Sequence, residues 1–280
     1  MKFINSRNAI LNTGSEVPFL TFPCLSGLDF IRHGFSTRLG GISKGCFESM
    51  NLGSSRGDDP EAVDENFNRI SKSIGIPRDD LVLSDQVHHT VVRYVTEADK
   101  GKGMSRERDY EGVDGLITDV PGIPLVTFYA DCVPLYFADK KNRAIGLSHS
   151  GWRGTVKRMG AVTLDAMKRY FGTEPKDVTI VIGPSICPDC YEVDTDVAEA
   201  FRQEFTEVQM REIIRDKGNG KFRLNLWEAN RCILTDAGIP GENICVSGVC
   251  TCCNSELLFS HRASGGKRGT LAAFLMLESL

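Results

Sequence analysis

One thiol and two imidazoles are the side chains in this sequence with the clearest chemical potential. Cys132 follows the apolar stretch 125–129, and His149 follows the apolar stretch 144–147, so both lie where predicted buried strands end. His88 lies between two further predicted strands. Zinc binds Cys sulfur and His nitrogen, and a catalytic zinc site uses three protein ligands and one open position. The three residues therefore form a candidate zinc site, although a structural Cys with two hydrogen-bonded histidines remains open.

A second chemistry needs no metal. Cys132 could act as a nucleophile with His149 as its base, and Asp131 could orient the imidazole or accept a proton. If the backbone is extended at Asp131, its side chain points away from that of Cys132. A third hypothesis is a binding protein whose zinc is structural.

The sequence predicts a mixed α/β chain, whose strands and helices must position these residues. Asp59 and Pro60 predict the start of a helix that ends before Gly75, with apolar residues repeating at helical spacing. Without an internal repeat or a linker, we expect one domain over residues 1–280. The other predicted elements are strands at 31–38, 125–129, 133–137, 144–147, 178–182, 244–247 and 271–277, and helices at 154–171, 194–205 and 226–237.

Composition and charge exclude several classes of protein. Hydrophobic residues make up 41% and charged residues 25% of the chain, which is ordinary for a globular protein with a buried core. The net charge of -4 gives no electrostatic case for nucleic-acid binding. No run of 18 apolar residues predicts a membrane span, and the N-terminus lacks the apolar region of a secretory signal. We therefore expect a cytoplasmic protein.

The chain has 10 cysteines, which is many for a cytoplasmic protein. Two groups invite a second, structural zinc site. Buried thiols are the favoured interpretation, with an oxidation-sensitive pair as the next. The groups are Cys187-x-x-Cys190 and Cys250-x-Cys252-Cys253.

Collinear motifs over nearly the whole chain resemble the laccase-domain family, which was first labelled multicopper polyphenol oxidase and is now assigned as purine nucleoside phosphorylases. The Trp-Arg-Gly run is the most unusual of them. The motifs are His33-Gly34-Phe35-Ser36-Thr37-Arg38, Asn51-Leu52-Gly53, Gln86-Val87-His88, Asp114-Gly115-Leu116-Ile117-Thr118, Ala130-Asp131-Cys132-Val133-Pro134, His149-Ser150-Gly151-Trp152-Arg153-Gly154, Ile182-Gly183-Pro184-Ser185-Ile186, Cys190-Tyr191-Glu192-Val193 and Phe259-Ser260-His261-Arg262.

The resemblance implies a layered sandwich of mixed β-sheets with flanking helices. It implies that His88, Cys132 and His149 bind zinc and take part in catalysis. The implied reactions are phosphorolysis of adenosine, inosine and methylthioadenosine, and deamination of adenosine. The partners would be a purine nucleoside and phosphate, with the protein a monomer or small homo-oligomer. Some members resemble peptidoglycan editing factors, a role that the metal-free Cys–His chemistry could also serve.

Multicopper oxidase chemistry is excluded by counting. The chain has five histidines and no His-x-His pair, whereas four coppers need about ten imidazoles. A single copper ion could still replace zinc at the same three ligands, because Cu²⁺ generally binds more tightly than Zn²⁺.

Substrate contacts are expected from four residues in the matching motifs. Arg153 lies where Gly151 to Gly154 opens the predicted helix 154–171, and a helix N-terminus with an arginine suits phosphate. Arg38 lies in a second Gly-rich loop and is the other phosphate candidate. Gln86 and Asn51 complete the set. Trp152 is expected to pack in the core rather than stack on a purine.

Overall fold

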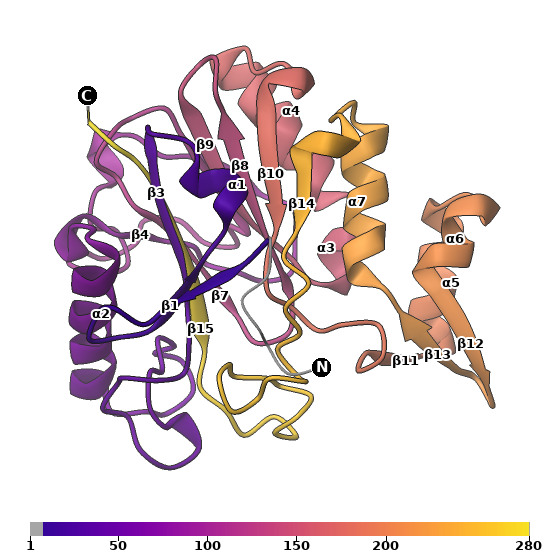
Figure 1. Ribbon diagram of the computed structural model, residues 1–280, viewed down its shortest axis with the longest axis horizontal. Helices are drawn as coiled ribbons and strands as arrows, with labels where there is room; N and C mark the ends of the chain where they lie inside the picture. The colour runs from indigo at the N-terminus through magenta and orange to yellow at the C-terminus, as the bar shows by residue number, and fades with distance from the viewer. Residues whose placement is uncertain (1–7, 280) are drawn as a thin grey trace.

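The computed structural model describes residues 8–279, and their core is a sandwich of two six-stranded sheets (Figure 1). The first sheet mixes antiparallel pairs with one parallel pair, β4 with β7. Its order is β1-β2-β3-β15-β7-β4, formed by Ile10–Asn12, Phe19–Thr21, Ile31–Ser36, Leu271–Leu277, Leu125–Tyr129 and Val82–Leu83.

The second sheet is mixed as well, with parallel pairs at both of its edges. Every residue of its central strands β8 and β9 is buried, because the first sheet covers one face and helices cover the other. Its order is β14-β10-β8-β9-β6-β5, formed by Ile244–Val246, Val178–Ile182, Val133–Asp139, Ala144–Ser150, Gly115–Thr118 and Val92–Tyr94.

The main core lies between the two sheets. Phe35 and Leu275 from the first sheet share it with Tyr136 and Leu147 from the second. The hydroxyl of Tyr136 crosses the interface and donates a hydrogen bond of 2.9 Å to the carbonyl of Gly34 in β3. Apolar burial and one buried polar contact therefore hold the sheets face to face.

Helices cover the outer faces of the sandwich and complete four layers. Helix α2 (Pro60–Ile74) packs Phe67 and Ile70 against the first sheet, and the Asp59 carboxylate caps its N-terminus. Helices α4 (Met159–Phe171) and α7 (Leu226–Asp236) cover the second sheet, while α1 (Pro23–Ser26) and α3 (Trp152–Val156) are short. The layered α/β sandwich expected from the sequence is confirmed.

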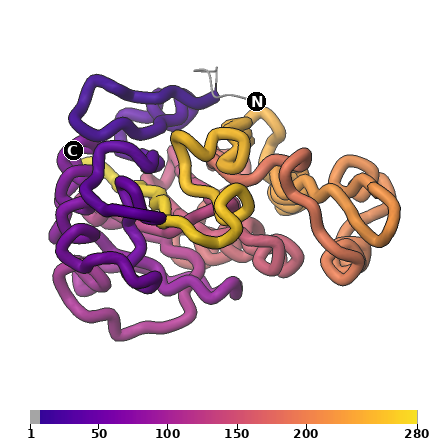
Figure 2. Tube along the Cα trace, turned by 90° about the horizontal axis from the view of Figure 1, so that it is seen from below, coloured from indigo at the N-terminus to yellow at the C-terminus, as the bar shows by residue number. Residues whose placement is uncertain are grey.

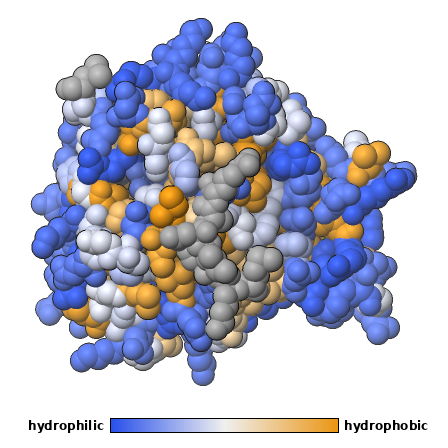
Figure 3. All heavy atoms as spheres, in the orientation of Figure 1, coloured by the Kyte–Doolittle hydropathy of each residue, from blue (hydrophilic) through white to orange (hydrophobic). Residues whose placement is uncertain are grey.

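A smaller part of the chain projects from one side of the sandwich (Figures 1 and 2). It contains the sheet β11-β13-β12 and two helices, and its surface in Figure 3 is mostly hydrophilic. Its strands were not expected from the sequence. The bounds are Glu192–Asp194 (β11), Lys221–Leu224 (β13), Ile214–Gly218 (β12), Thr195–Glu204 (α5) and Glu207–Ile213 (α6).

The prediction of one helix over 154–171 is wrong, because the structure has two helices there. Helix α3 ends at Val156, and Arg158 adopts a left-handed backbone with φ of 58° before α4 begins. No helix within residues 8–279 is long and apolar enough to cross a membrane.

Candidate active site

The three side chains expected to bind metal lie together at one end of the sandwich. Their ligand atoms are all within 4.8 Å of one another. His149 lies within β9, Cys132 lies in the turn between β7 and β8, and His88 lies in the loop that follows β4. Strands β7 and β9 belong to different sheets, so the group forms only where the two sheets meet.

Asp114 organises this group, although sequence analysis gave it no role. Its buried carboxylate accepts hydrogen bonds from the backbone N–H groups of Val87, His88 and His89, at 2.9–3.1 Å. These bonds hold His88 in a left-handed backbone with φ of 62°. The same carboxylate lies 2.8 Å from Nδ1 of His149, which leaves Nε2 to face the group. A buried acid ahead of an apolar strand was the available signal in the sequence.

The electrostatics of the group favour a charged thiolate. Burial alone would raise the pKa of Cys132, but the nearby His149 and His88 rings offset it and lower this pKa to about 6. Burial alone would lower the pKa of His149, but the Cys132 thiolate and Asp114 raise it to about 9. The carboxyl pKa of Asp114, which burial would raise, is lowered by His149 and by the backbone donors.

Gly151 leaves space for the group. A Cβ atom built at this position would lie 2.9 Å from Sγ of Cys132 and 3.0 Å from Nδ1 of His88. Both distances are too short for a real Cβ contact without movement of the ligands. The backbone of Gly151, which caps α3, therefore closes one side of the site without filling it.

The group lies in the wall of a cavity of about 1080 Å³. Four arginines line the same cavity: Arg56, Arg106, Arg108 and Arg268. Buried Nε of Arg268 has no hydrogen-bond partner in the described structure, and burial together with Arg56 lowers its pKa to about 10. Four carboxylates line the cavity as well: Asp64, Asp85, Glu107 and Glu111. Arg108 pairs with Asp85 at 2.9 Å, and Arg106 donates to the carbonyls of Ala98 and Lys100. Arg56 and Arg268 are therefore the lining arginines that suit an anionic ligand.

Asp131 does not join the three candidate ligands. Its backbone is left-handed, with φ of 92°, so the extended geometry considered from the sequence is wrong. Its carboxylate accepts hydrogen bonds from Thr251 Oγ1 at 2.6 Å and from the Arg262 N–H at 2.7 Å. It is absent from the residues that line the cavity, so in the described structure it positions the turn that carries Cys132.

Two of the expected substrate contacts are engaged in local structure. The guanidinium of Arg38 donates to the carbonyls of Glu48 and Ser255 and lies over Phe259. The buried amide of Asn51 accepts from the N–H of Thr270 and donates to Asp58, among other bonds. Neither residue lines the large cavity.

Gln86 and Arg153 have different surroundings. Gln86 lines the cavity, but its amide also exchanges two hydrogen bonds with the backbone of Phe128. Arg153 is exposed and lies over Trp152, outside the residues that line the cavity. Trp152 packs against the outer core, as expected from the sequence.

The donor set fits a single metal ion. A thiolate and two imidazoles are ligands that zinc accepts, and among residues 8–279 the group has three members, which leaves a position for substrate. His88 belongs to this group, whereas its neighbour His89 does not.

A family model described as multi-copper polyphenol oxidoreductase laccase matches residues 32–278 of the chain. The chain belongs to this family. Two curated relatives carry the name purine nucleoside phosphorylase YlmD. That of Geobacillus stearothermophilus is 37% identical over 246 residues, covering 86% of this chain and 88% of the relative. That of Bacillus subtilis is 37% identical over 249 residues, covering 88% of each.

A further curated relative and two solved structures extend the comparison. Adenosine deaminase RL5, from an unknown prokaryotic organism, is 33% identical over 252 residues. The alignment covers 88% of this chain and 95% of the relative. The crystal structure of YlmD from Geobacillus stearothermophilus superposes with a TM-score of 0.89 at 34% identity, over 97% of this chain and 100% of that one. YfiH from Bacillus licheniformis gives 0.89 at 33% identity, over 96% and 99%.

Proposed function

We propose that this protein is a zinc-dependent purine nucleoside phosphorylase that acts on adenosine, inosine and methylthioadenosine and also deaminates adenosine. The observation that carries the proposal is the convergence of His88, Cys132 and His149 on the wall of an arginine-lined cavity. The names of the relatives support the choice of substrate.

In this proposal each residue has a separate task. His88, Cys132 and His149 hold the metal ion, and Asp114 fixes the tautomer of His149 by accepting from Nδ1. Bound zinc supplies Lewis acidity toward a substrate or water oxygen, and copper could occupy the same ligands. Gly151 keeps the space beside the sulfur open.

Phosphate is proposed to bind at Arg268 with Arg56, in place of the Arg153 and Arg38 considered from the sequence. Arg56 and Arg268 line the cavity, whereas Arg38 and Arg153 lie outside its lining. A guanidinium fork donates two parallel hydrogen bonds to a phosphate. The purine would lie against the apolar part of the wall, which includes Phe128 and Met104.

The test compares Arg268→Met with Arg153→Ala in nucleoside cleavage at varied phosphate concentrations. Losing a charge-assisted hydrogen bond worth about 1.5–3 kcal/mol should raise the phosphate KM about 10-fold or more in Arg268→Met. Arg153→Ala should keep the KM of the unmutated enzyme. A phosphate KM that moves only in Arg153→Ala would return the phosphate to the start of α3.

A metal-free Cys–His hydrolase, acting for example on a peptidoglycan precursor, is the second candidate. The lowered pKa of Cys132 and the raised pKa of His149, with Asp114 behind the ring, are what a thiolate–imidazolium pair needs. His88 favours the metal, because a catalytic pair has no need of a second imidazole beside the sulfur. Activity that survives complete metal removal but is lost on thiol alkylation would select the hydrolase.

The proposal includes a location and an assembly. The chain has 10 cysteines, and a reducing compartment keeps thiols available for metal binding, so we propose a cytoplasmic location. We propose one catalytic domain over residues 1–280 that works as a monomer or small homo-oligomer.

A further inference from the structure

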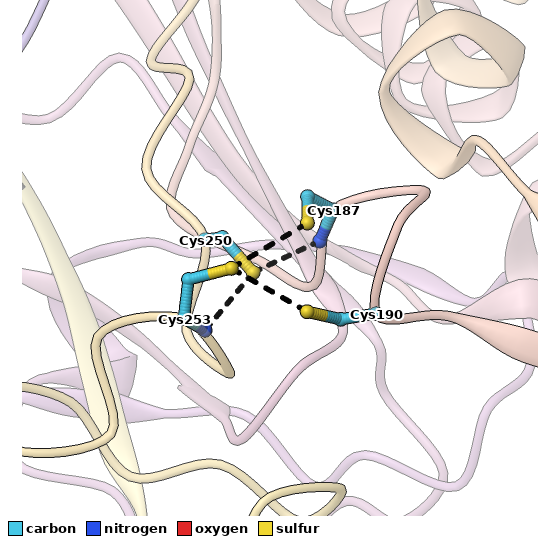
Figure 4. Close-up of side chains that lie close together, drawn as sticks. All are labelled: Cys187, Cys190, Cys250 and Cys253. Carbon is cyan, nitrogen blue, oxygen red and sulfur yellow. Dashed lines mark hydrogen bonds between the residues drawn. The ribbon is translucent and has the colours of Figure 1, made fainter. Parts of the chain in front are cut away.

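Four cysteines outside the candidate active site gather in space from two distant loops (Figure 4). Cys187 and Cys190 precede β11, and Cys250 and Cys253 follow β14. Each pair has the spacing Cys-x-x-Cys, and all four Sγ atoms lie within 4.8 Å of one another. The sequence interpretation of separate buried thiols does not account for this convergence.

We propose that these four cysteines bind a structural zinc ion. Zinc–sulfur bonds of about 2.3 Å in a tetrahedron place the sulfur atoms about 3.8 Å apart. The Sγ atom of Cys253 lies 3.4 Å from that of Cys190 and 3.9 Å from that of Cys187. An iron–sulfur cluster divides its cysteines among several irons, so it would hold them farther apart than a single ion does.

The backbone around the sulfurs is arranged to stabilise thiolates. The N–H groups of Cys187 and Cys253 both donate to Sγ of Cys250, at 3.2 and 3.3 Å. The backbone carbonyl of Cys187 accepts the N–H of Cys190 at 3.1 Å, which closes the tight turn between these two cysteines. The guanidinium of Arg262 donates to the carbonyl of Cys190, which places a positive charge near the group. Hydrogen bonds from N–H groups to a metal thiolate lower the cost of its negative charge.

The ion would hold together the two ends of a long segment of the chain. Residues 191–249 lie between the two pairs and include the projecting sheet with α5 and α6. Next to the ligands, Thr251 donates to Asp131, whose neighbour is Cys132. Closing this loop with a metal removes conformational freedom from the unfolded chain, and it holds the turn that carries Cys132.

Metal content of the full-length protein provides the test, measured by elemental analysis and native mass spectrometry. The unmutated protein should carry two zinc ions per chain. The double variant His88→Ala/His149→Ala should keep one, and Cys187→Ser/Cys190→Ser should keep the other and melt at a lower temperature. One zinc per chain that disappears in the histidine variant would overturn the proposal.

Two controls separate this site from nonspecific thiol effects. Cys252→Ser, one residue from Cys253, and Cys46→Ser, at an exposed position, should each keep both ions. X-ray absorption of zinc in the histidine variant should give four sulfur neighbours. Nitrogen or oxygen neighbours, iron at the site, or a disulfide between the two loops would overturn the proposal.

A measurement on the unmutated protein covers the case in which the cysteine variant does not fold. A chelator first removes the zinc bound by the active-site residues. A mercurial thiol reagent should then release one further zinc ion as Cys187, Cys190, Cys250 and Cys253 react. Release of zinc before any of these thiols react would contradict the assignment.

Discussion

Gly151 has no Cβ atom, and this leaves room for the three candidate ligands. In Gly151→Ala the new Cβ would lie 2.9 Å from Sγ of Cys132, so the sulfur or the backbone must move. Because displacement of about 1 Å in a catalytic group costs on the order of 100-fold in rate, we expect phosphorolysis to fall by about that factor. Zinc content should fall as well, measured on the same preparation.

Gly154 offers the matched control in the same helix. A Cβ there meets its nearest neighbour, the carbonyl of His149, at an ordinary 3.5 Å. Gly154→Ala should therefore keep zinc and activity. Equal activity in the two variants would contradict the steric role of Gly151.

Asp114 contacts two of the candidate ligands and should strengthen metal binding. Asp114→Asn keeps the shape of the side chain but removes the charge that orients His149 and holds the backbone of His88. Loss of such a partner commonly weakens metal binding about 10- to 100-fold. Competition with a chelator of known affinity measures the change, and an unaltered zinc affinity would show that Asp114 only shapes the loop.

The candidate ligands could be proposed from the sequence because thiol and imidazole chemistry is a property of the residue type, and the fold brings the three side chains together. Asp114 and the proposed phosphate contact Arg268 could not, since what they can do depends on which backbone groups and cavity walls the fold brings to them. Arg153 illustrates the same limit. It was placed at the start of one long helix, but the helix breaks at Arg158 and the guanidinium lies over Trp152.

Elements with strong apolar patterns were predicted well. Strands β7, β10 and β15 occupy the predicted ranges, because burial on both faces makes each a continuous apolar run. Strand β12 was missed because four of its five residues are exposed, and its sequence IRDKG has no apolar alternation. Its pairing with β13 comes from the hairpin and from tertiary packing rather than from local propensity.

Strand β3 contains a titratable residue with a consequence for stability. Nε2 of buried His33 accepts a hydrogen bond of 2.9 Å from the N–H of Phe22, which requires the neutral ring. Burial lowers its pKa from 6.5 to about 4. The unfolded chain therefore binds this proton more readily than the folded one, so stability is full above pH 6.5 and is lost as the pH falls toward 4.

Chemical denaturation between pH 8 and pH 4 measures this effect. The shift corresponds to roughly 3 kcal/mol in the free energy of unfolding. His33→Gln keeps an acceptor for Phe22 but cannot titrate, so its loss of stability across this range should be smaller by about that amount. Parallel pH profiles for the two proteins would mean that the pKa of His33 is the same in the folded and the unfolded chain.

At the scale of the whole molecule, the candidate site depends on the register between two sheets. Strands β4 and β7 of the first sheet lead to His88 and Cys132, and β9 of the second sheet carries His149. Two buried hydroxyls cross this interface, from Tyr136 to Gly34 and from Tyr129 to Ser148. Apolar packing is nondirectional, so we infer that these hydrogen bonds help to fix how the sheets align.

The contact of Tyr136 allows a test. Tyr136→Phe keeps the ring in the core but leaves the Gly34 carbonyl without this donor, which should lower the free energy of unfolding by about 1–3 kcal/mol. Tyr94→Phe is the control, because that hydroxyl donates to Asp119 at an exposed position and should cost little. Urea unfolding with unchanged slopes gives both values. If Tyr136→Phe is as stable as Tyr94→Phe, the bond from Tyr136 to Gly34 does not help to align the two sheets, and the active-site geometry does not depend on it.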